Sequence, residues 1–156
     1  MIKCEFENGN KASLRHVCAD VLVLKDDKIL LQLRSEKLLM EPGKWALAGG
    51  FIDLNETVVE GAEREVPEET GWKVRDIELL RVLDDPKRRH DPRQNIVFLY
   101  AATATEKVGE GDWETDELRW FALTDLPTAA EMAFDHLESI NYYLGRVAQL
   151  PQSKVE

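Results

Sequence analysis

The segment Gly50–Trp72, GFIDLNETVVEGAEREVPEETGW, constrains the fold of this chain more than any other. It predicts a helix over about Glu56–Thr70, because Asn55 or Thr57 can cap its start and acidic side chains occupy its first turn. Gly71 stands where a left-handed residue would end the helix. The segment therefore predicts one helix with defined ends.

The predicted helix carries several carboxylates on one face. At about 100° per residue, Glu65, Glu68 and Glu69 fall within one arc of about 100°, beside an apolar stripe. Such carboxylates repel one another unless a positive charge lies between them, and oxygen ligands of this kind suit Mg²⁺ or Mn²⁺. A solvated acidic face is the ordinary alternative. The preceding glycine turn, whose backbone can approach a metal closely, favours a metal site.

Pro67 interrupts this acidic run. A proline inside a helix costs about 3 kcal/mol, here by removing the donor that would bond to the Glu63 carbonyl. On the helical wheel its ring points roughly opposite to the carboxylate arc. We therefore expect a continuous but kinked helix whose carboxylates still converge.

The remainder of the chain predicts strands and a second helix. Strands at Val17–Leu24 and Lys28–Arg34 would be joined by a turn at Asp26 and Asp27. Further strands are expected in the segments WALAGGF, WKVRDIELLRVLDD, QNIVFLYAATAT and ELRWFAL. Residues 127–150 have the spacing of a terminal amphipathic helix. This order of elements favours an α/β or α+β sandwich, with helices packed on a mixed sheet.

Composition and charge narrow the class of protein. The 156 residues are 44% hydrophobic and 32% charged, which fits one soluble domain. No apolar run approaches the roughly 18 residues of a membrane span. A net charge of −10 opposes binding to nucleic acid or anionic membranes. The start lacks signal-peptide features, and Cys4 and Cys18 match no metal or redox spacing, so we expect a cytoplasmic protein.

The segment Gly50–Trp72 resembles the signature of the Nudix hydrolases. That signature is glycine, five residues, Glu, seven residues, Arg-Glu, a bulky apolar residue, any residue, Glu-Glu, any residue, glycine and a bulky apolar residue, and every fixed position is occupied. The segments ELRWFALTDLP, MAFDH and DPRQNIVFLYAA are similar to the branch that cleaves ADP-ribose and related nucleotide sugars. The likeness covers about residues 16–148 and implies a single α/β/α-sandwich domain over residues 1–156.

The resemblance implies hydrolysis of a diphosphate that links a nucleoside to a second group, with Mg²⁺, or alternatively Mn²⁺, as the cofactor. It implies four metal ligands: Glu65, Glu68, Glu69 and the backbone carbonyl of Gly49. Glu65 could alternatively orient or deprotonate the attacking water. Residues expected to support the site are Glu56, Arg64, Gly50 and Gly71, with Arg64 anchoring Glu56.

Other candidates lie outside this segment. In some branches of the family the base is a glutamate on a later loop, for which Glu114 is the favoured match here, although an acidic loop with no catalytic part is an equal alternative. The resemblance places Arg34 as a substrate contact facing the cleft. Trp45 is a candidate for packing against a nucleobase, although aromatic strand residues are more often core. Arg88, in the basic cluster Lys87–Arg93, is a candidate phosphate or ribose contact, with a solvated hairpin tip as the favoured alternative.

Three functions are consistent with these residues. The first is a Mg²⁺-dependent pyrophosphatase for ADP-ribose or a related nucleotide sugar. The second is a nucleoside triphosphate or dinucleotide hydrolase, because the signature leaves the leaving group open. The third is a sensor that binds such a ligand without cleaving it, against which the complete set of carboxylates argues. The resemblance also implies a homodimer.

Overall fold

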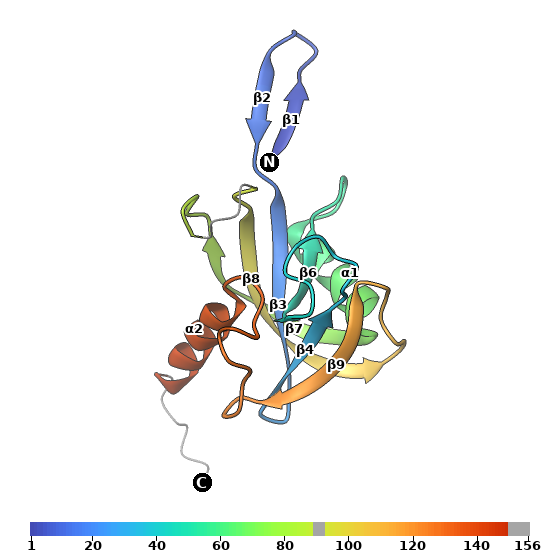
Figure 1. The fold of residues 1–156 in the computed structure, drawn as a ribbon, viewed down its shortest axis with the longest axis vertical. Coiled ribbons are helices and arrows are strands. Elements are labelled where there is room, and N and C mark those ends of the chain that lie inside the picture. The colour runs from blue at the N-terminus through green and yellow to red at the C-terminus, as the bar shows by residue number, and fades with distance from the viewer. Residues whose placement is uncertain (89–92, 150–156) are drawn as a thin grey trace.

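The computed structural model describes residues 1–88 and 93–149. Within them, one mixed sheet contains β3 (Val17–Lys25), β4 (Lys28–Arg34), β5 (Trp45–Ala46), β6 (Ala48–Phe51), β7 (Trp72–Leu83), β8 (Ile96–Lys107) and β9 (Thr115–Ala122). The strand order is β5-β4-β3-β8-β7, with β6 also paired to β3 and β9 to β4 (Figure 1). Strands β3 and β8 run parallel, while the other pairs are antiparallel.

Two helices cover this sheet, α1 (Val58–Thr70) and α2 (His136–Ala148). Alternate residues of a strand point to opposite faces. Accordingly, Ala19, Val21 and Val23 of β3 belong to one core cluster with Ala62 and Val66 of α1. Cys18 and Leu22 belong to a second cluster with Ile140 of α2. The chain is an α/β/α sandwich on a mixed sheet, as predicted.

The turn between β3 and β4 is the predicted one. Asp26 and Asp27 both have positive φ, 49° and 57°. Two such residues between antiparallel strands form the tight turn whose twist matches that of the strands. The segment WALAGGF, in contrast, contains two strands rather than one, because Leu47 lies between β5 and β6 and its N–H donates to Nδ1 of His136 at 3.0 Å.

Helix α1 has the predicted caps. Thr57 is the N-cap: its hydroxyl accepts from the Glu60 N–H at 3.2 Å, and the Glu60 carboxylate accepts from the Thr57 N–H at 2.7 Å. Gly71 ends the helix with φ of 67°, and an added Cβ there would lie 2.0 Å from the Gly109 carbonyl oxygen. The helix passes through Pro67 without a break, which confirms its continuity. The kink stays a prediction.

Helix α2 begins later than predicted, at His136 instead of Pro127. Residues before it bind the backbone of β5 instead: the Trp45 N–H donates to the Glu131 carbonyl at 2.9 Å, and the Ala133 N–H donates to the Trp45 carbonyl at 2.8 Å. Phe134 then has a positive φ of 54°, which a continuous helix does not allow. Leu150, the predicted end, lies outside the described residues.

The first residues form a separate two-stranded sheet of β1 (Ile2–Glu5) and β2 (Lys11–Leu14). It extends away from the body of the molecule (Figure 1). The sequence interpretation did not include it. In the described part of the chain, neither helix combines the length and the apolar character that crossing a membrane requires.

Candidate active site

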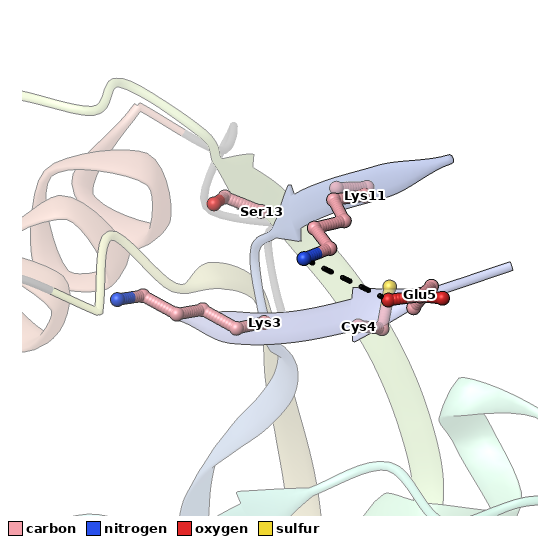
Figure 2. A pocket seen from close by; sticks show the side chains of 6 residues that line it. Lys3, Cys4, Glu5, Lys11 and Ser13 are labelled. Carbon is pink, nitrogen blue, oxygen red and sulfur yellow. Dashed lines mark ion pairs between the residues drawn. The ribbon is translucent and has the colours of Figure 1, made fainter. Parts of the chain in front are cut away.

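A cavity of about 730 Å³ lies beside β6 and is lined by half of the predicted site residues: Arg34, Gly49, Gly50, Glu65, Glu69 and Glu114. Its lining includes the carboxylates Asp53, Glu65, Glu69 and Glu114 and the cations Arg34, Lys37 and Arg93. A smaller hollow of about 410 Å³ on the β1–β2 hairpin carries an exposed Lys11–Glu5 ion pair of 3.9 Å (Figure 2). Opposite charges that face one interior space are typical of a binding site, so the larger cavity is the candidate active site.

Glu69 is the most deeply buried carboxylate of this cavity, with 5% of its surface exposed. Its Oε2 accepts from the Gly49 N–H at 2.7 Å and from Nε2 of Gln32 at 2.9 Å. Gln32 is itself buried and held by the Leu47 carbonyl and the Thr115 hydroxyl. Both of these donors to Glu69 are neutral, so they fix its position without supplying a positive charge.

Burial changes the protonation of this carboxylate. It raises the pKa of Glu69 from its ordinary 4.5 to about 8, since the charged form loses its hydration, and the nearby charges of Glu65 and Glu114 act in the same direction. Burial also raises the pKa of Glu65, although the Arg64 guanidinium opposes this shift. Two neighbouring carboxylates whose pKa values are raised by burial are typical of a functional site.

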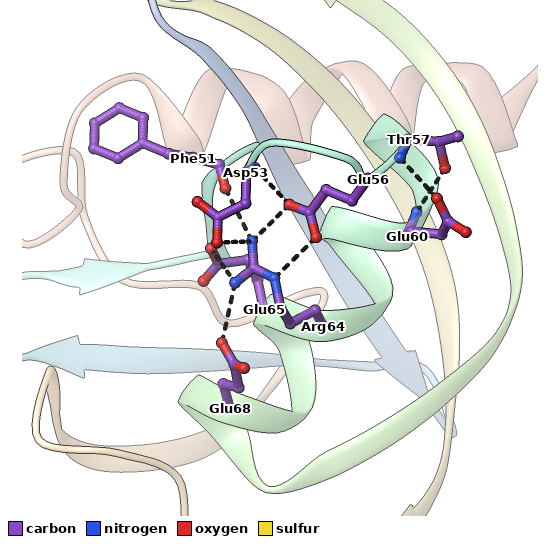
Figure 3. A network of polar contacts seen from close by, with 8 residues as sticks. All are labelled: Phe51, Asp53, Glu56, Thr57, Glu60, Arg64, Glu65 and Glu68. Carbon is purple, nitrogen blue, oxygen red and sulfur yellow. Dashed lines mark hydrogen bonds and ion pairs between the residues drawn. The ribbon is translucent and has the colours of Figure 1, made fainter.

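Arg64 connects several polar groups on the exposed side of helix α1 (Figure 3). It donates to both oxygens of Glu56, at 3.0 Å and 2.8 Å, which is the expected pairing, and to the Phe51 carbonyl at 3.1 Å. Its Nη1 also donates to Glu65 at 2.9 Å and to Glu68 at 3.0 Å. These bonds raise the pKa of Arg64, and the bond from Arg64 lowers the pKa of Glu56 to about 2.

The loop before α1 curls back to make this pairing. Oε1 of Glu56 also accepts from the Asp53 N–H at 2.6 Å, so one carboxylate holds both the loop and the helix. A guanidinium that binds a carboxylate through two parallel bonds fixes orientation as well as distance. The network therefore locks the loop after β6 against α1.

The glycines of β6 are required by close contacts. Gly49 has φ of 148°, and an added Cβ would lie 2.0 Å from the Ala19 carbonyl oxygen. At Gly50 an added Cβ would lie 2.5 Å from Oε1 of Glu65. Side chains at either position would displace β3 or the carboxylate, so glycine keeps this part of the cavity open beside Glu65 and Glu69.

The donors present fit a hard divalent cation. Glu65 and Glu69 offer carboxylate oxygens, their pKa values are raised by burial, and Gly50 leaves space beside them. As they stand, no three His, Cys, Asp or Glu side chains of residues 1–88 and 93–149 are grouped to enclose a metal. Nη1 of Arg64 bonds to both Glu65 and Glu68, at 2.9 Å and 3.0 Å. Glu65 and Glu69 already line the cavity, and Glu68 would join them by leaving Arg64.

Cations line another part of the cavity. Nε and Nη2 of Arg34 donate to the Met40 carbonyl at 3.2 Å and 2.9 Å, and the guanidinium lies 5.1 Å from the ring centroid of Phe134. Burial lowers the pKa of Arg34, and the positive charge of Arg93 contributes. Lys37 and Arg93 line the same space. The structure thus brings Arg34 to the cavity, together with Arg93 of the basic cluster and Lys37, which the sequence interpretation did not name.

The loop that carries Glu114 is tied to both sides of the cavity. The Gly71 carbonyl accepts from the N–H groups of Val108 and Gly109, at 2.7 Å and 3.2 Å. At the other end, the Glu114 carbonyl accepts from the Ser35 N–H at 2.8 Å. These bonds hold the Glu114 side chain in the lining of the cavity, together with Glu65 and Glu69.

Two candidates are placed elsewhere. Trp45 packs edge-to-face on Phe121, with 4.9 Å between ring centroids, and belongs to the core on the α2 side instead of the cavity lining. Arg88 forms an ion pair with Asp135 and is also not among the residues that line the cavity. Each is engaged within the protein, and a role of either residue in substrate binding stays a prediction. Arg89 and His90 of the same basic cluster lie outside the described residues.

Several cavity residues escaped the sequence interpretation. Asp20 lines the cavity, with its Oδ2 3.3 Å from Nε2 of His136. Asn95 also lines it, just before β8. A signal for Asp20 was present: it is an acidic residue inside the apolar strand ADVLVL, where a charge is retained only with a partner. Asn95 offered no comparable signal.

Known proteins match this chain along most of its length. The family model described as NUDIX domain matches residues 14–143. The ADP-ribose pyrophosphatase of Methanocaldococcus jannaschii is 38% identical over 132 residues, which cover 82% of this chain and 72% of that protein. The NAD-capped RNA hydrolase NudC of Pseudomonas aeruginosa is 28% identical over 126 residues, which cover 81% of this chain and 43% of that protein.

A solved structure extends the similarity to three dimensions. The NUDIX domain of NrtR from Shewanella oneidensis, solved in a complex with ADP ribose, matches with a TM-score of 0.71 and 26% sequence identity. The match covers 87% of this chain and 90% of that domain. It agrees with the α/β/α arrangement described above.

Proposed function

Because this chain belongs to the Nudix family, we propose that it hydrolyses the diphosphate linkage of ADP-ribose or a related nucleotide sugar with the help of Mg²⁺. The observation that carries this proposal is the arrangement of charges in one cavity. The half-buried carboxylate of Glu65 and the buried one of Glu69 share it with Arg34, Lys37 and Arg93. A diphosphate between a carboxylate-bound cation and these side chains would meet positive charge from both.

The cationic residues overcome a general electrostatic barrier. The chain carries a net charge of −10, which repels a diphosphate at long range. Arg34 is held by the Met40 carbonyl and keeps N–H groups on a fixed guanidinium plane, which suits phosphate oxygens. We assign Arg34, with Lys37 and Arg93, to binding the diphosphate.

The carboxylates would hold the divalent cation. Glu65 and Glu69 are the first ligands in this proposal, with the Gly49 carbonyl and with Glu68 once it has left Arg64. Bound there, Mg²⁺ or Mn²⁺ would neutralise phosphate charge and activate water. Glu56 and Arg64 hold the loop and helix that carry these ligands, and Gly71 anchors the Glu114 loop.

Glu114 is the proposed base, with Glu65 as the alternative. The water oxygen forms a bond to one phosphorus atom, the carboxylate accepts its proton, and the bond from that phosphorus to the bridging oxygen breaks. The bridging oxygen leaves with the other phosphate. From ADP-ribose the products would be AMP and ribose 5-phosphate, two phosphate monoesters.

The remaining features of the protein follow as proposals. We propose one domain over residues 1–156 that acts in the cytoplasm as a homodimer. Light scattering coupled to size-exclusion chromatography measures the assembly directly: twice the 17.8 kDa chain mass supports the dimer, and the chain mass alone excludes it.

A substrate panel tests the activity. ADP-ribose, other nucleotide sugars, nucleoside triphosphates and dinucleotides are incubated with the purified chain and Mg²⁺, and the phosphate-containing products are identified. We expect the highest kcat/KM for ADP-ribose or another nucleotide sugar, and no turnover in excess chelator. Preferred hydrolysis of a triphosphate or dinucleotide would refute the substrate class. Binding of ADP-ribose without turnover of any compound would indicate a sensor.

A further inference from the structure

One end of the cavity carries polar groups to which the proposed binding of metal and diphosphate assigns no role. It is formed by β3 and the start of β8, which run parallel with Cys18 opposite Val97 and Asp20 opposite Leu99. Because side chains alternate along strands, Cys18, Asp20, Asn95 and Val97 all project from the α2 face of the sheet. All four line the cavity.

Asn95 is the group at this end that calls for a ligand. Only 9% of its surface is exposed, and its Oδ1 is buried with no hydrogen-bond partner in the described part of the chain. A buried carbonyl oxygen without a donor destabilises the protein relative to one that accepts a hydrogen bond. Since Asn95 lines the cavity, a donor on a bound ligand can supply the missing bond.

Asp20 adds a second acceptor whose orientation is fixed. Nδ1 of His136 accepts from the Leu47 N–H at 3.0 Å, so in the neutral ring the proton resides on Nε2. Nε2 lies 3.3 Å from Oδ2 of Asp20. His136 is 4% exposed and connects three elements at this point, so it holds the Asp20 carboxylate in the cavity wall.

The chemistry of these groups selects the ligand. A carboxylate and an amide oxygen accept hydrogen bonds and repel phosphate, so they suit neutral donors. Phe51 and Val97 supply apolar surface at the same end, and Phe51 is held edge-to-face against His16, with 4.7 Å between centroids. A ring with apolar faces and adjacent hydroxyl groups matches both features, and a nucleotide sugar contains two such rings.

We propose that Asn95 and Asp20 form a sugar subsite that binds the adjacent hydroxyl groups of a ribose of the substrate. This inference rests on the proposed function, and it deepens it by assigning the recognition of the sugar to residues outside the family signature. The ribose can be that of the adenosine or the second sugar, and the two are separated by choice of probe.

Three probes divide the possibilities. ADP-ribose carries both sugars, the ethyl ester of ADP retains only the adenosine hydroxyls, and the ethyl ester of 2′,3′-dideoxy-ADP has neither pair of hydroxyls. Wild type, Asn95→Ala and Asp20→Asn are compared on each with Mg²⁺ for kcat and KM. Asn10→Ala, an exposed asparagine on the β1–β2 hairpin, is the matched control. Thermal unfolding reports whether each variant is folded.

We expect Asn95→Ala to raise KM about tenfold for the probes that carry the recognised ribose, with kcat within about twofold of wild type. The KM for the dideoxy probe and all values for Asn10→Ala should stay at the wild-type level. An increase with ADP-ribose alone assigns the second sugar, and an increase with both hydroxyl-bearing probes assigns the adenosine ribose. Asp20→Asn should raise KM for the same probes, so the test remains decisive if Asn95→Ala does not fold.

Two other outcomes overturn the subsite in different ways. In the first outcome, wild type hydrolyses all three probes, and each variant either raises the KM of all three equally or changes the KM of none. The sugar subsite is then wrong, while the proposed function stands. If wild type hydrolyses none of them and no other nucleotide diphosphate, the proposed function is wrong and the subsite falls with it.

Discussion

Glu56 and Glu69 show what two environments at one helix do to the same side chain. Glu56 bonds to the Arg64 guanidinium, which lowers its pKa to about 2. Glu69 is buried among neutral donors, and burial raises its pKa to about 8. Glu56 therefore bonds to a cation of the protein, whereas within residues 1–88 and 93–149 the donors bonded to Glu69 are neutral.

This difference separates a structural region from a functional one. A charged group buried without a partner costs stability, so a sequence retains one only where another requirement outweighs that cost. The paired region, Glu56 and Arg64, builds the joint between loop and helix. The unpaired region is Glu69, where an incoming cation would complete the charge balance, while its neighbour Glu65 bonds to Arg64 at 2.9 Å.

Removing the unpaired charge should have the largest effect. Glu69→Gln keeps the shape of the side chain and an acceptor for the Gly49 N–H, but loses the carboxylate that would hold the cation. We expect kcat/KM for the best substrate to fall about 10³-fold, while the protein stays folded. Steady-state turnover with Mg²⁺ and circular dichroism measure the two properties. Activity within about tenfold of wild type would remove Glu69 from the metal site.

Glu114 is the next test of the unpaired side. Glu114→Gln removes the proposed base and should lower kcat about 10²-fold, with KM little changed. Glu110→Gln, on the same loop but paired with Lys107 at the surface, is the control and should retain wild-type turnover. If the two variants have equal rates, Glu114 is not the base and Glu65 becomes the candidate.

Weakening the paired side should affect stability and activity together. A lysine cannot make the two-pronged bond to Glu56, so Arg64→Lys loosens the loop before α1. We expect a fall of about tenfold in kcat/KM and of about 2–6 °C in the unfolding midpoint. Arg119→Lys, which alters the exposed pair with Glu117, is the control and should change neither. A normal midpoint with reduced activity would mean that Arg64 acts on the substrate and not through the loop.

The two sides should also respond to pH in opposite ways. The folded pKa of Glu69, about 8, lies above its ordinary value of 4.5, so the folded state binds more protons in between. Its contribution to stability is full below pH 4.5 and is lost as pH rises to about 8. The folded pKa of Glu56, about 2, lies below 4.5, so its contribution is full above pH 4.5 and is lost as pH falls toward 2.

Unfolding midpoints from pH 3 to pH 9 compare these contributions. Glu69→Gln should gain stability relative to wild type as pH rises from about 5 to about 8. Glu56→Gln should lose less stability than wild type as pH falls below about 4.5. Parallel curves for wild type and Glu69→Gln would show that Glu69 is ionised throughout this range.

The smallest effect is expected at Pro67, which lies between Arg64 and Glu69 in the sequence. Alanine there restores a donor toward the Glu63 carbonyl, so the unfolding midpoint should rise by about 2–4 °C. The proline ring points away from the carboxylates on the helical wheel, so kcat of Pro67→Ala should stay within about twofold of wild type. A loss of more than tenfold would mean that the proline sets the ligand geometry.

The sequence predicted what local patterns determine. The strand β3, the turn at Asp26 and Asp27, and the caps at Thr57 and Gly71 depend on neighbouring residues, and all are present. The late start of α2 depends on backbone bonds between Trp45 and a segment more than eighty residues away, which no local pattern reports. The prediction from helical spacing therefore started this helix too early in the sequence.

The same limit of local patterns decides which site residues could be predicted. The carboxylates of α1 follow a fixed spacing and could be named in advance. Gln32, Asp20, His136 and Asn95 come from four elements and meet only in the folded chain. Trp45 and Arg88 had suitable chemistry, but the fold engages them with Phe121 and Asp135. Residue type alone did not separate a cavity residue from a core or ion-pair residue.

The central claim is that Glu69 receives its countercharge from a divalent cation. A titration of Mg²⁺ against the thermal unfolding midpoint at pH 7 tests it most directly, because an ion that binds only the folded state raises the midpoint. We predict that the midpoint of wild type rises with Mg²⁺, while that of Glu69→Gln stays constant. An equal rise in both proteins, or no rise in either, would contradict the claim.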